Sequence, residues 1–182
     1  MVTKFSLVHQ GVTNLEAEGI VNGTNNAIAG KDAMCQKAGK VVQDACAQIL
    51  STRGPLVAGD TFITEGGALS AKKIIHVIAP LWNPTVEEKS LSLLSMTYCN
   101  VLDAAIEAGI RVLALQPVGT IIEKFPKKQA AKTALNTVAE YLENNPDSFD
   151  SIIFVCDDNA EFKIYEKRWD DFLKRVNNTK TV

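Results

Sequence analysis

The chain has 182 residues, of which 46% are hydrophobic and 22% are charged, and its formal net charge is -2. This balance is typical of a globular domain, and it gives no overall attraction to nucleic acid or to an anionic membrane surface. No apolar run is long enough to span a membrane, and the first residues lack the apolar core of a signal peptide. We therefore expect one intracellular domain over residues 1–182, cytoplasmic or nuclear, either alone or cut from a longer protein.

Short apolar segments alternate with amphipathic ones along the chain. The apolar segments predict strands over residues 5–9, from 19 to a break at Gly23, and over 61–64, 73–79, 111–115 and 151–156. The amphipathic segments predict helices over residues 32–50, 86–108, 127–143 and 162–176. This alternation predicts an α/β fold, a three-layer α/β/α sandwich with a mixed, mostly parallel central sheet.

The cysteines give no sequence signal for a metal site. None of Cys35, Cys46, Cys99 and Cys156 forms a C-x-x-C pair, and the chain has only two histidines. We therefore expect no zinc site and no metal. Three of these cysteines, Cys46, Cys99 and Cys156, fall in apolar patterns typical of buried thiols in an intracellular protein.

The second strand ends in the segment Asn22-Gly23-Thr24-Asn25. A buried strand with this ending places amide side chains and backbone N–H groups at the carboxyl edge of the sheet, where open α/β sheets bind ligands. Asparagine offers both donors and acceptors without a charge, which suits a polyhydroxylated ligand such as a ribose. The alternative is that Asn25 binds the backbone of its own loop.

Four motifs in chain order resemble those of the macro domain, an ADP-ribose-binding module. They are Ile20–Asn25, similar to V-N-A-A-N; Gly54–Asp60; Ile74–Pro80, similar to I-H-x-V-G-P; and Phe125-Pro126 before an alanine-rich helix. The resemblance runs from about Leu7 to Leu173. The stretch through Gly54 is most similar to the macro domain of a variant histone, and also resembles those of some ADP-ribosyltransferases.

The resemblance implies a ligand cleft at the carboxyl ends of the central strands. In the family, one loop and the following helix N-terminus hold the pyrophosphate, and a second glycine-rich loop closes over it. Asn25 matches the asparagine that contacts the distal ribose. The implied ligand is ADP-ribose or an ADP-ribosylated protein, with no cofactor. The implied ligand-binding residues are Asn22, Asn25, Gly30, Asp32, Val118, Gly119, Thr120, Ile121, Ile122 and Phe125.

The sequence departs from the family pattern around this cleft. Gly11 stands where the family has the aspartate that contacts adenine, and the loop over residues 26–31 is shortened. Ile121 replaces a glycine, and a β-branched residue does not readily adopt a positive φ. Glu123 replaces an aromatic residue and would repel a phosphate. Asp157 and its neighbours follow the last strand, where a ring that stacks on adenine is expected.

Three functional hypotheses remain. The first is a reader of ADP-ribosylation that binds ADP-ribose or a related nucleotide with weakened or altered affinity. The second is a protein-interaction or scaffold domain that has lost this ligand. The third is a hydrolase that removes ADP-ribose from proteins, with Asn25 and Asp32 as the only candidate residues. The altered loops place hydrolysis last, because small positioning errors greatly reduce a catalytic rate. The sequence therefore favours a binding module over an enzyme.

Overall fold

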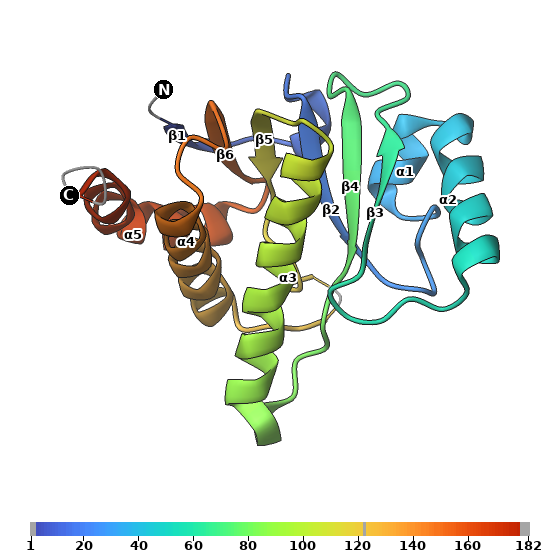
Figure 1. The fold of residues 1–182 in the computed structure, drawn as a ribbon. Helices are drawn as coiled ribbons and strands as arrows, with labels where there is room; N and C mark the ends of the chain where they lie inside the picture. The colour runs from blue at the N-terminus through green and yellow to red at the C-terminus, as the bar shows by residue number, and fades with distance from the viewer. Residues whose placement is uncertain (1–2, 122, 179–182) are drawn as a thin grey trace.

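The structure, a computed structural model, describes residues 3–121 and 123–178 and consists of a six-stranded sheet with helices on both faces (Figure 1). The strands are β1 (Lys4–His9), β2 (Gly19–Thr24), β3 (Thr61–Glu65), β4 (Lys73–Ile78), β5 (Val112–Leu115) and β6 (Ser151–Cys156). The helices are α1 (Ala33–Ala38), α2 (Lys40–Arg53), α3 (Glu87–Glu107), α4 (Lys127–Asn144) and α5 (Asn159–Asn178), with 3-10 turns η1 (Val12–Asn14) and η2 (Pro84–Val86). Within these ranges, no helix is both long and apolar enough to cross a bilayer.

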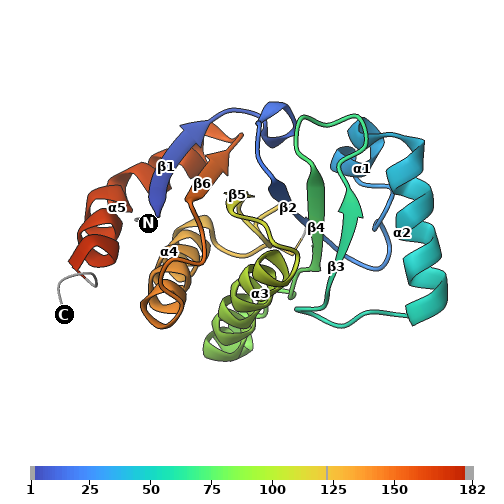
Figure 2. The same ribbon diagram turned by 45° about the horizontal axis from the view of Figure 1, so that its top comes forward.

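The sheet has the strand order β1-β6-β5-β2-β4-β3, and only the β3–β4 pair is antiparallel. Helices α1 and α2 cover one face, and α3, α4 and α5 cover the other (Figure 2). Along β4, Ile75 and Val77 pack on the α3 side, whereas Ile74 and Ile78 pack on the α1 side. Successive side chains of a strand point to opposite faces, so apolar strands hold both helix layers. The predicted three-layer α/β/α sandwich with a mixed, mostly parallel sheet is confirmed.

The single helix predicted over residues 32–50 is two helices in the structure. Gly39 separates α1 from α2 with a φ of 95°, a left-handed conformation that favours glycine. The carbonyl of Ala38 accepts a hydrogen bond from the N–H of Ala68 at 2.9 Å, outside the helix. The apolar spacing on both sides of Gly39 fits one helix, so the pattern alone did not show the break.

Helix α5 begins at Asn159, before the predicted start at Phe162. Asp158 Oδ1 accepts a hydrogen bond from the backbone N–H of Glu161 at 2.7 Å, which is the contact of an N-cap residue. The earlier start places Glu161 in the first turn of α5, where its side chain lines the cleft described next.

Candidate functional site

A cleft of about 670 Å³ lies at the carboxyl ends of β1, β2, β5 and β6. Strands β2 and β5 are neighbours, but the helices that follow them, α1 and α4, cover opposite faces of the sheet. The loops after these two strands therefore diverge and leave an opening, as at other ligand sites of open α/β sheets. We call residues 25–32 the first loop and residues 116–126 the second loop.

The predicted ligand-binding residues divide into two groups. Asn22, Asp32, Gly119 and Ile121 line the cleft. Asn25, Gly30, Val118, Thr120 and Phe125 belong to the same two loops but are not part of the lining. Ile122 lies outside the described residues.

Asn22 and Asp32 form one hydrogen-bonded unit in the wall of the cleft. Asn22 is 3% exposed, and its Nδ2 donates to Asp32 Oδ2 at 3.1 Å and faces His76 Nδ1 at 3.2 Å. Asp32 also accepts from the hydroxyl of Thr24 at 3.1 Å and from the backbone N–H of Cys35 at 3.0 Å. Asp32 is therefore the N-cap of α1, and its carboxylate occupies the helix end that would otherwise attract an anion.

Asn25 holds the first loop together. Its Oδ1 accepts from the backbone N–H groups of Ala27 and Ile28 at 3.0 and 3.2 Å. Its Nδ2 donates to Glu123 Oε1 of the second loop at 3.4 Å. The alternative considered from the sequence, in which Asn25 binds its own loop, describes its Oδ1 contacts, and its amide nitrogen links the two loops.

The second loop makes its left-handed turns at Gly119 and Lys124, whose φ angles are 83° and 63°. Ile121 avoids a positive φ, as expected for a β-branched residue, and its side chain is 78% exposed at the cleft. The backbone N–H of Phe125 donates to the carbonyl of Gly119 at 3.0 Å. A Cβ added at Gly119 would lie 2.9 Å from the ring of Phe125, so close packing under the loop requires glycine there. Val118 is buried behind this turn.

Acidic side chains outnumber basic ones in the lining of the cleft. Among the described residues, the ionisable groups of the lining are Asp32, Glu123, Asp157, Asp158, Glu161, Lys37 and Lys127. Lys127 Nζ forms an ion pair with Asp158 at 2.7 Å. Glu161 adds a further carboxyl group to this lining and was not among the predicted residues.

The sequence profile of the Macro domain family matches residues 21–134. The chain belongs to the macro domain family. A macro domain-containing protein of Cupriavidus necator is 31% identical over 166 residues, which cover 89% of this chain and 95% of that protein. A protein named O-acetyl-ADP-ribose deacetylase, from Cronobacter sakazakii, is 30% identical over 171 residues, which cover 92% of this chain and 94% of that protein.

Solved macrodomain structures share the fold. The Trypanosoma brucei macrodomain in complex with ADP has a TM-score of 0.79 and 26% identity, and the match covers 90% of this chain and 68% of that one. A variant of the Oceanobacillus iheyensis macrodomain with ADP-ribose has a TM-score of 0.83 and 24% identity, and the match covers 92% of each chain. The second likeness concerns the fold alone.

One end of the cleft of this macro domain lies beside β1 and β6 and lacks an aromatic wall among its described lining residues. Gly11 and Asp157 line this end. Phe162, the first ring after β6, instead stacks on His9 with 5.0 Å between ring centroids. Gly11 carries no carboxylate and Asp157 carries no ring, so this end of the cleft lacks both groups that the resemblance implies for adenine.

Two carboxyl groups of the lining are buried. Glu123 and Glu161 are each 5% exposed, and burial raises the pKa of both side chains, because charge is disfavoured away from water. Neither Glu161 Oε1 nor Thr120 Oγ1 has a hydrogen-bond partner within the described residues. The Thr120 hydroxyl lowers the pKa of Glu161 by less than burial raises it.

The raised pKa of Glu161 predicts a pH-dependent cost to stability. The folded state holds the proton more tightly than the unfolded state, so stability falls as pH rises from the ordinary carboxyl range through the raised pKa. We expect Glu161→Gln to remove part of this fall. The unfolding free energy of the variant minus that of the wild type should therefore increase as pH rises from 4 to 8. Urea denaturation across this pH range measures the difference.

The matched control for this prediction is Glu166→Gln, which changes an exposed glutamate of the same helix. Its difference from the wild type should stay small at every pH. A Glu161→Gln difference that is constant from pH 4 to 8 would contradict the prediction.

Proposed function

We propose that this macro domain binds ADP-ribose or a related nucleotide, free or attached to a protein, with an affinity weakened by the acidic lining of its cleft. The observation that carries the proposal is the cleft itself, about 670 Å³ in volume, with Asn22, Gly23 and Gly119 in its lining. Its volume lies in the usual range of about 300–1,000 Å³ for small-molecule sites. The solved Trypanosoma brucei macrodomain in complex with ADP supports this class of ligand.

The expected weakening follows from charge. A carboxylate about 8 Å from a phosphate costs about 2 kcal/mol at an effective dielectric constant of about 20. Two such carboxylates, at Glu123 and Glu161, are enough to move a micromolar dissociation constant, about -8 kcal/mol, toward millimolar, about -4 kcal/mol. Since burial raises the pKa of both groups, this opposition weakens as pH falls.

Isothermal calorimetry with ADP-ribose tests the proposal. We expect saturable binding with a dissociation constant on the order of 0.1–1 mM at pH 7.5. Asn25→Ala should weaken it by roughly 10-fold, because the first loop loses the two backbone contacts of Asn25 and its link to Glu123, at about 1 kcal/mol each with partial compensation by water. Asn144→Ala, which changes an exposed residue in the last turn of α4, should bind as the wild type does.

A flat titration at millimolar ADP-ribose, with protein shown to be folded, would reject ligand binding and favour the scaffold hypothesis. The exposed Ile121 at the mouth of the cleft is then the first residue to test for contact with a protein partner.

Hydrolysis of an ADP-ribose ester is the second candidate function. The observation that favours it is the relative from Cronobacter sakazakii, which is 30% identical and is named O-acetyl-ADP-ribose deacetylase. Asp32 is a carboxylate of the lining, and its oxygens already accept hydrogen bonds from Asn22 and Thr24. Release of acetate from O-acetyl-ADP-ribose, lost in Asp32→Asn, would support this function over simple binding.

A further inference from the structure

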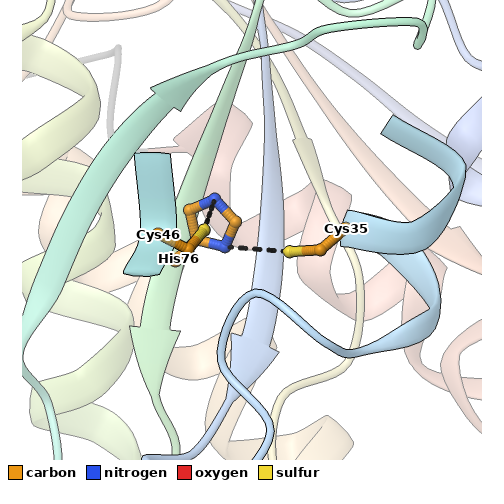
Figure 3. Close-up of side chains that lie close together, drawn as sticks. All are labelled: Cys35, Cys46 and His76. Atoms are coloured by element: carbon orange, nitrogen blue, oxygen red, sulfur yellow. Dashed lines mark hydrogen bonds between the residues drawn. The ribbon is translucent and has the colours of Figure 1, made fainter. Parts of the chain in front are cut away.

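Three side chains of kinds that bind metal ions lie close together behind the wall of the cleft. They come from three separate elements. Cys35 comes from α1, Cys46 from α2 and His76 from β4 (Figure 3). All three residues are 0% exposed, and one ligand atom of each lies within 4.8 Å of the other two. The residue spacings did not indicate this cluster, because its members are brought together by the turn at Gly39 and by the pairing of the sheet.

The hydrogen bonds of His76 decide which ring nitrogen carries the proton. A carboxylate only accepts, so the group of Asn22 that lies 3.1 Å from Asp32 is the amide nitrogen. The same nitrogen lies 3.2 Å from His76 Nδ1, which must therefore accept. The proton is on Nε2, which donates to the hydroxyl of Thr64 at 2.9 Å. Histidines that bind metals are commonly held in this way, with one ring N–H donating to a fixed partner.

The two sulfur atoms lie close to the imidazole and to each other. Cys35 Sγ is 4.0 Å from His76 Nδ1, and Cys46 Sγ is 3.8 Å from His76 Nε2. The two sulfur atoms lie within 4.8 Å of each other. In a tetrahedral zinc site, with Zn–S near 2.3 Å and Zn–N near 2.0 Å, ligand atoms lie about 3.5–3.8 Å apart. An ion on Nδ1 therefore displaces the hydrogen bond from Asn22, and it needs Cys46 to rotate toward Cys35 and the cluster to contract by about 1 Å or less.

A fourth oxygen ligand lies beside the cluster. Asp32 Oδ2 is 3.5 Å from Cys35 Sγ, which donates its S–H to it. When Cys35 loses this proton to become a thiolate, Asp32 Oδ2 loses one of its three donors, and a cation can take the place of that donor. Asp32 keeps its hydrogen bonds from Asn22 and Thr24, and these hold the carboxylate in place, as metal-binding carboxylates are usually held.

We propose that Cys35, Cys46 and His76 form a buried site for a thiophilic metal ion of the zinc class, completed by the carboxylate of Asp32. Two thiols and an imidazole select such an ion over Mg²⁺ or Ca²⁺, which prefer oxygen ligands. Binding replaces the two thiol protons, which are released to solvent, with bonds from the metal to two thiolates. The bound ion joins α1, α2 and β4, and it shares Asn22 and Asp32 with the cleft.

Gly30 shows how closely the first loop packs on this site. Its φ is 81°, and an added Cβ would lie 2.8 Å from Cys46 Cβ. Close packing against Cys46 therefore requires glycine at this predicted ligand-binding position. Phe62 stacks on the His76 ring with 4.6 Å between centroids, and it holds the ring from the β3 side.

Titration of the metal-free full chain with Co²⁺, in a non-thiol reductant, tests the proposal. We expect one equivalent to bind with the intense ultraviolet absorption of thiolate-to-cobalt charge transfer, and Zn²⁺ to displace it. Zinc binding should release about two protons into a weakly buffered solution, one from each thiol. Cys35→Ala and Cys46→Ala should each weaken Co²⁺ binding by more than about 100-fold, since changes to outer-shell partners alone cost about 10–100-fold.

Cys99→Ala is the matched control, because Cys99 is a partly exposed cysteine of α3 outside the cluster, and it should retain wild-type binding. The proposal fails if the wild type gives no thiolate absorption with one equivalent of Co²⁺. It also fails if Cys99→Ala loses as much affinity as Cys35→Ala. Proton release is measured on the wild type, so it stays decisive if a variant does not fold, and none of these readouts depends on nucleotide binding.

Discussion

Replacing Asn22 with alanine should lower the free energy of unfolding by about 2.5–6 kcal/mol and remove measurable ADP-ribose binding. The amide of Asn22 is buried and donates to both Asp32 and His76. Its loss removes a hydrogen bond to a charged group, at about 1.5–3 kcal/mol, and leaves His76 Nδ1 without its donor, at about 1–3 kcal/mol. Asp32 then loses one of the contacts that orient it toward the cleft, so the lining changes as well.

Urea denaturation at pH 7.5 measures this loss of stability, and calorimetry with ADP-ribose measures the loss of binding. Asn144→Ala changes an exposed asparagine and should stay within about 0.5 kcal/mol of the wild type. An Asn22→Ala protein as stable as this control would show that the hydrogen bonds of Asn22 contribute no net stability. A stable variant that still binds ADP-ribose would remove Asn22 from the candidate site.

The fold was predictable because hydrophobic periodicity is a local property. The strand over residues 73–78 carries apolar side chains on both faces, so sequence alone indicates a sheet covered on both sides. The break at Gly39 was not predictable in this way, because it depends on a contact between Ala38 and a turn far along the chain. Tertiary contacts therefore determine that the helix breaks at Gly39.

The candidate site was predictable where it follows directly from a strand end. Asn22, Asp32 and Gly119 line the cleft because the strands that precede them are parallel and end at one edge of the sheet. Glu161 was missed because it follows the last strand by a helical turn, and its approach to the cleft depends on where α5 begins. That start is fixed by the side chain of Asp158, which caps the helix. In the sequence, Asp158 stands in a short acidic run, and such a run is equally typical of a solvent-exposed segment.

The cysteine cluster was missed for a different reason. Metal sites are recognised in sequences by short spacings on one loop, and Cys35, Cys46 and His76 are each on a different element. Cys35 and Cys46 lie close together because the chain turns at Gly39, between α1 and α2. Sequence reasoning also could not separate a loop-capping role for Asn25 from a ligand role, because both use the same amide.

Neutralising the two buried carboxylates of the cleft should give the largest gain in affinity. We expect Glu123→Gln and Glu161→Gln each to tighten ADP-ribose binding on the order of 10-fold at pH 8, because each removes one negative charge beside the expected pyrophosphate path. Both changes keep the size of the side chain, and the amide introduced by Glu123→Gln retains an oxygen that accepts from Asn25. Calorimetry at pH 6 and pH 8 measures the effect.

The pH dependence follows from the raised pKa of both carboxyl groups. As pH falls toward the raised pKa, a growing share of the wild-type carboxyls is neutral, so the advantage of the variants should shrink from pH 8 to pH 6. Glu88→Gln removes an exposed charge from α3, outside the cleft, and should change affinity little at either pH. Equal affinities of the wild type and both cleft variants at pH 8 would show that these charges do not oppose the ligand, and the weak binding would then have to arise from the open end beside Gly11 and Asp157.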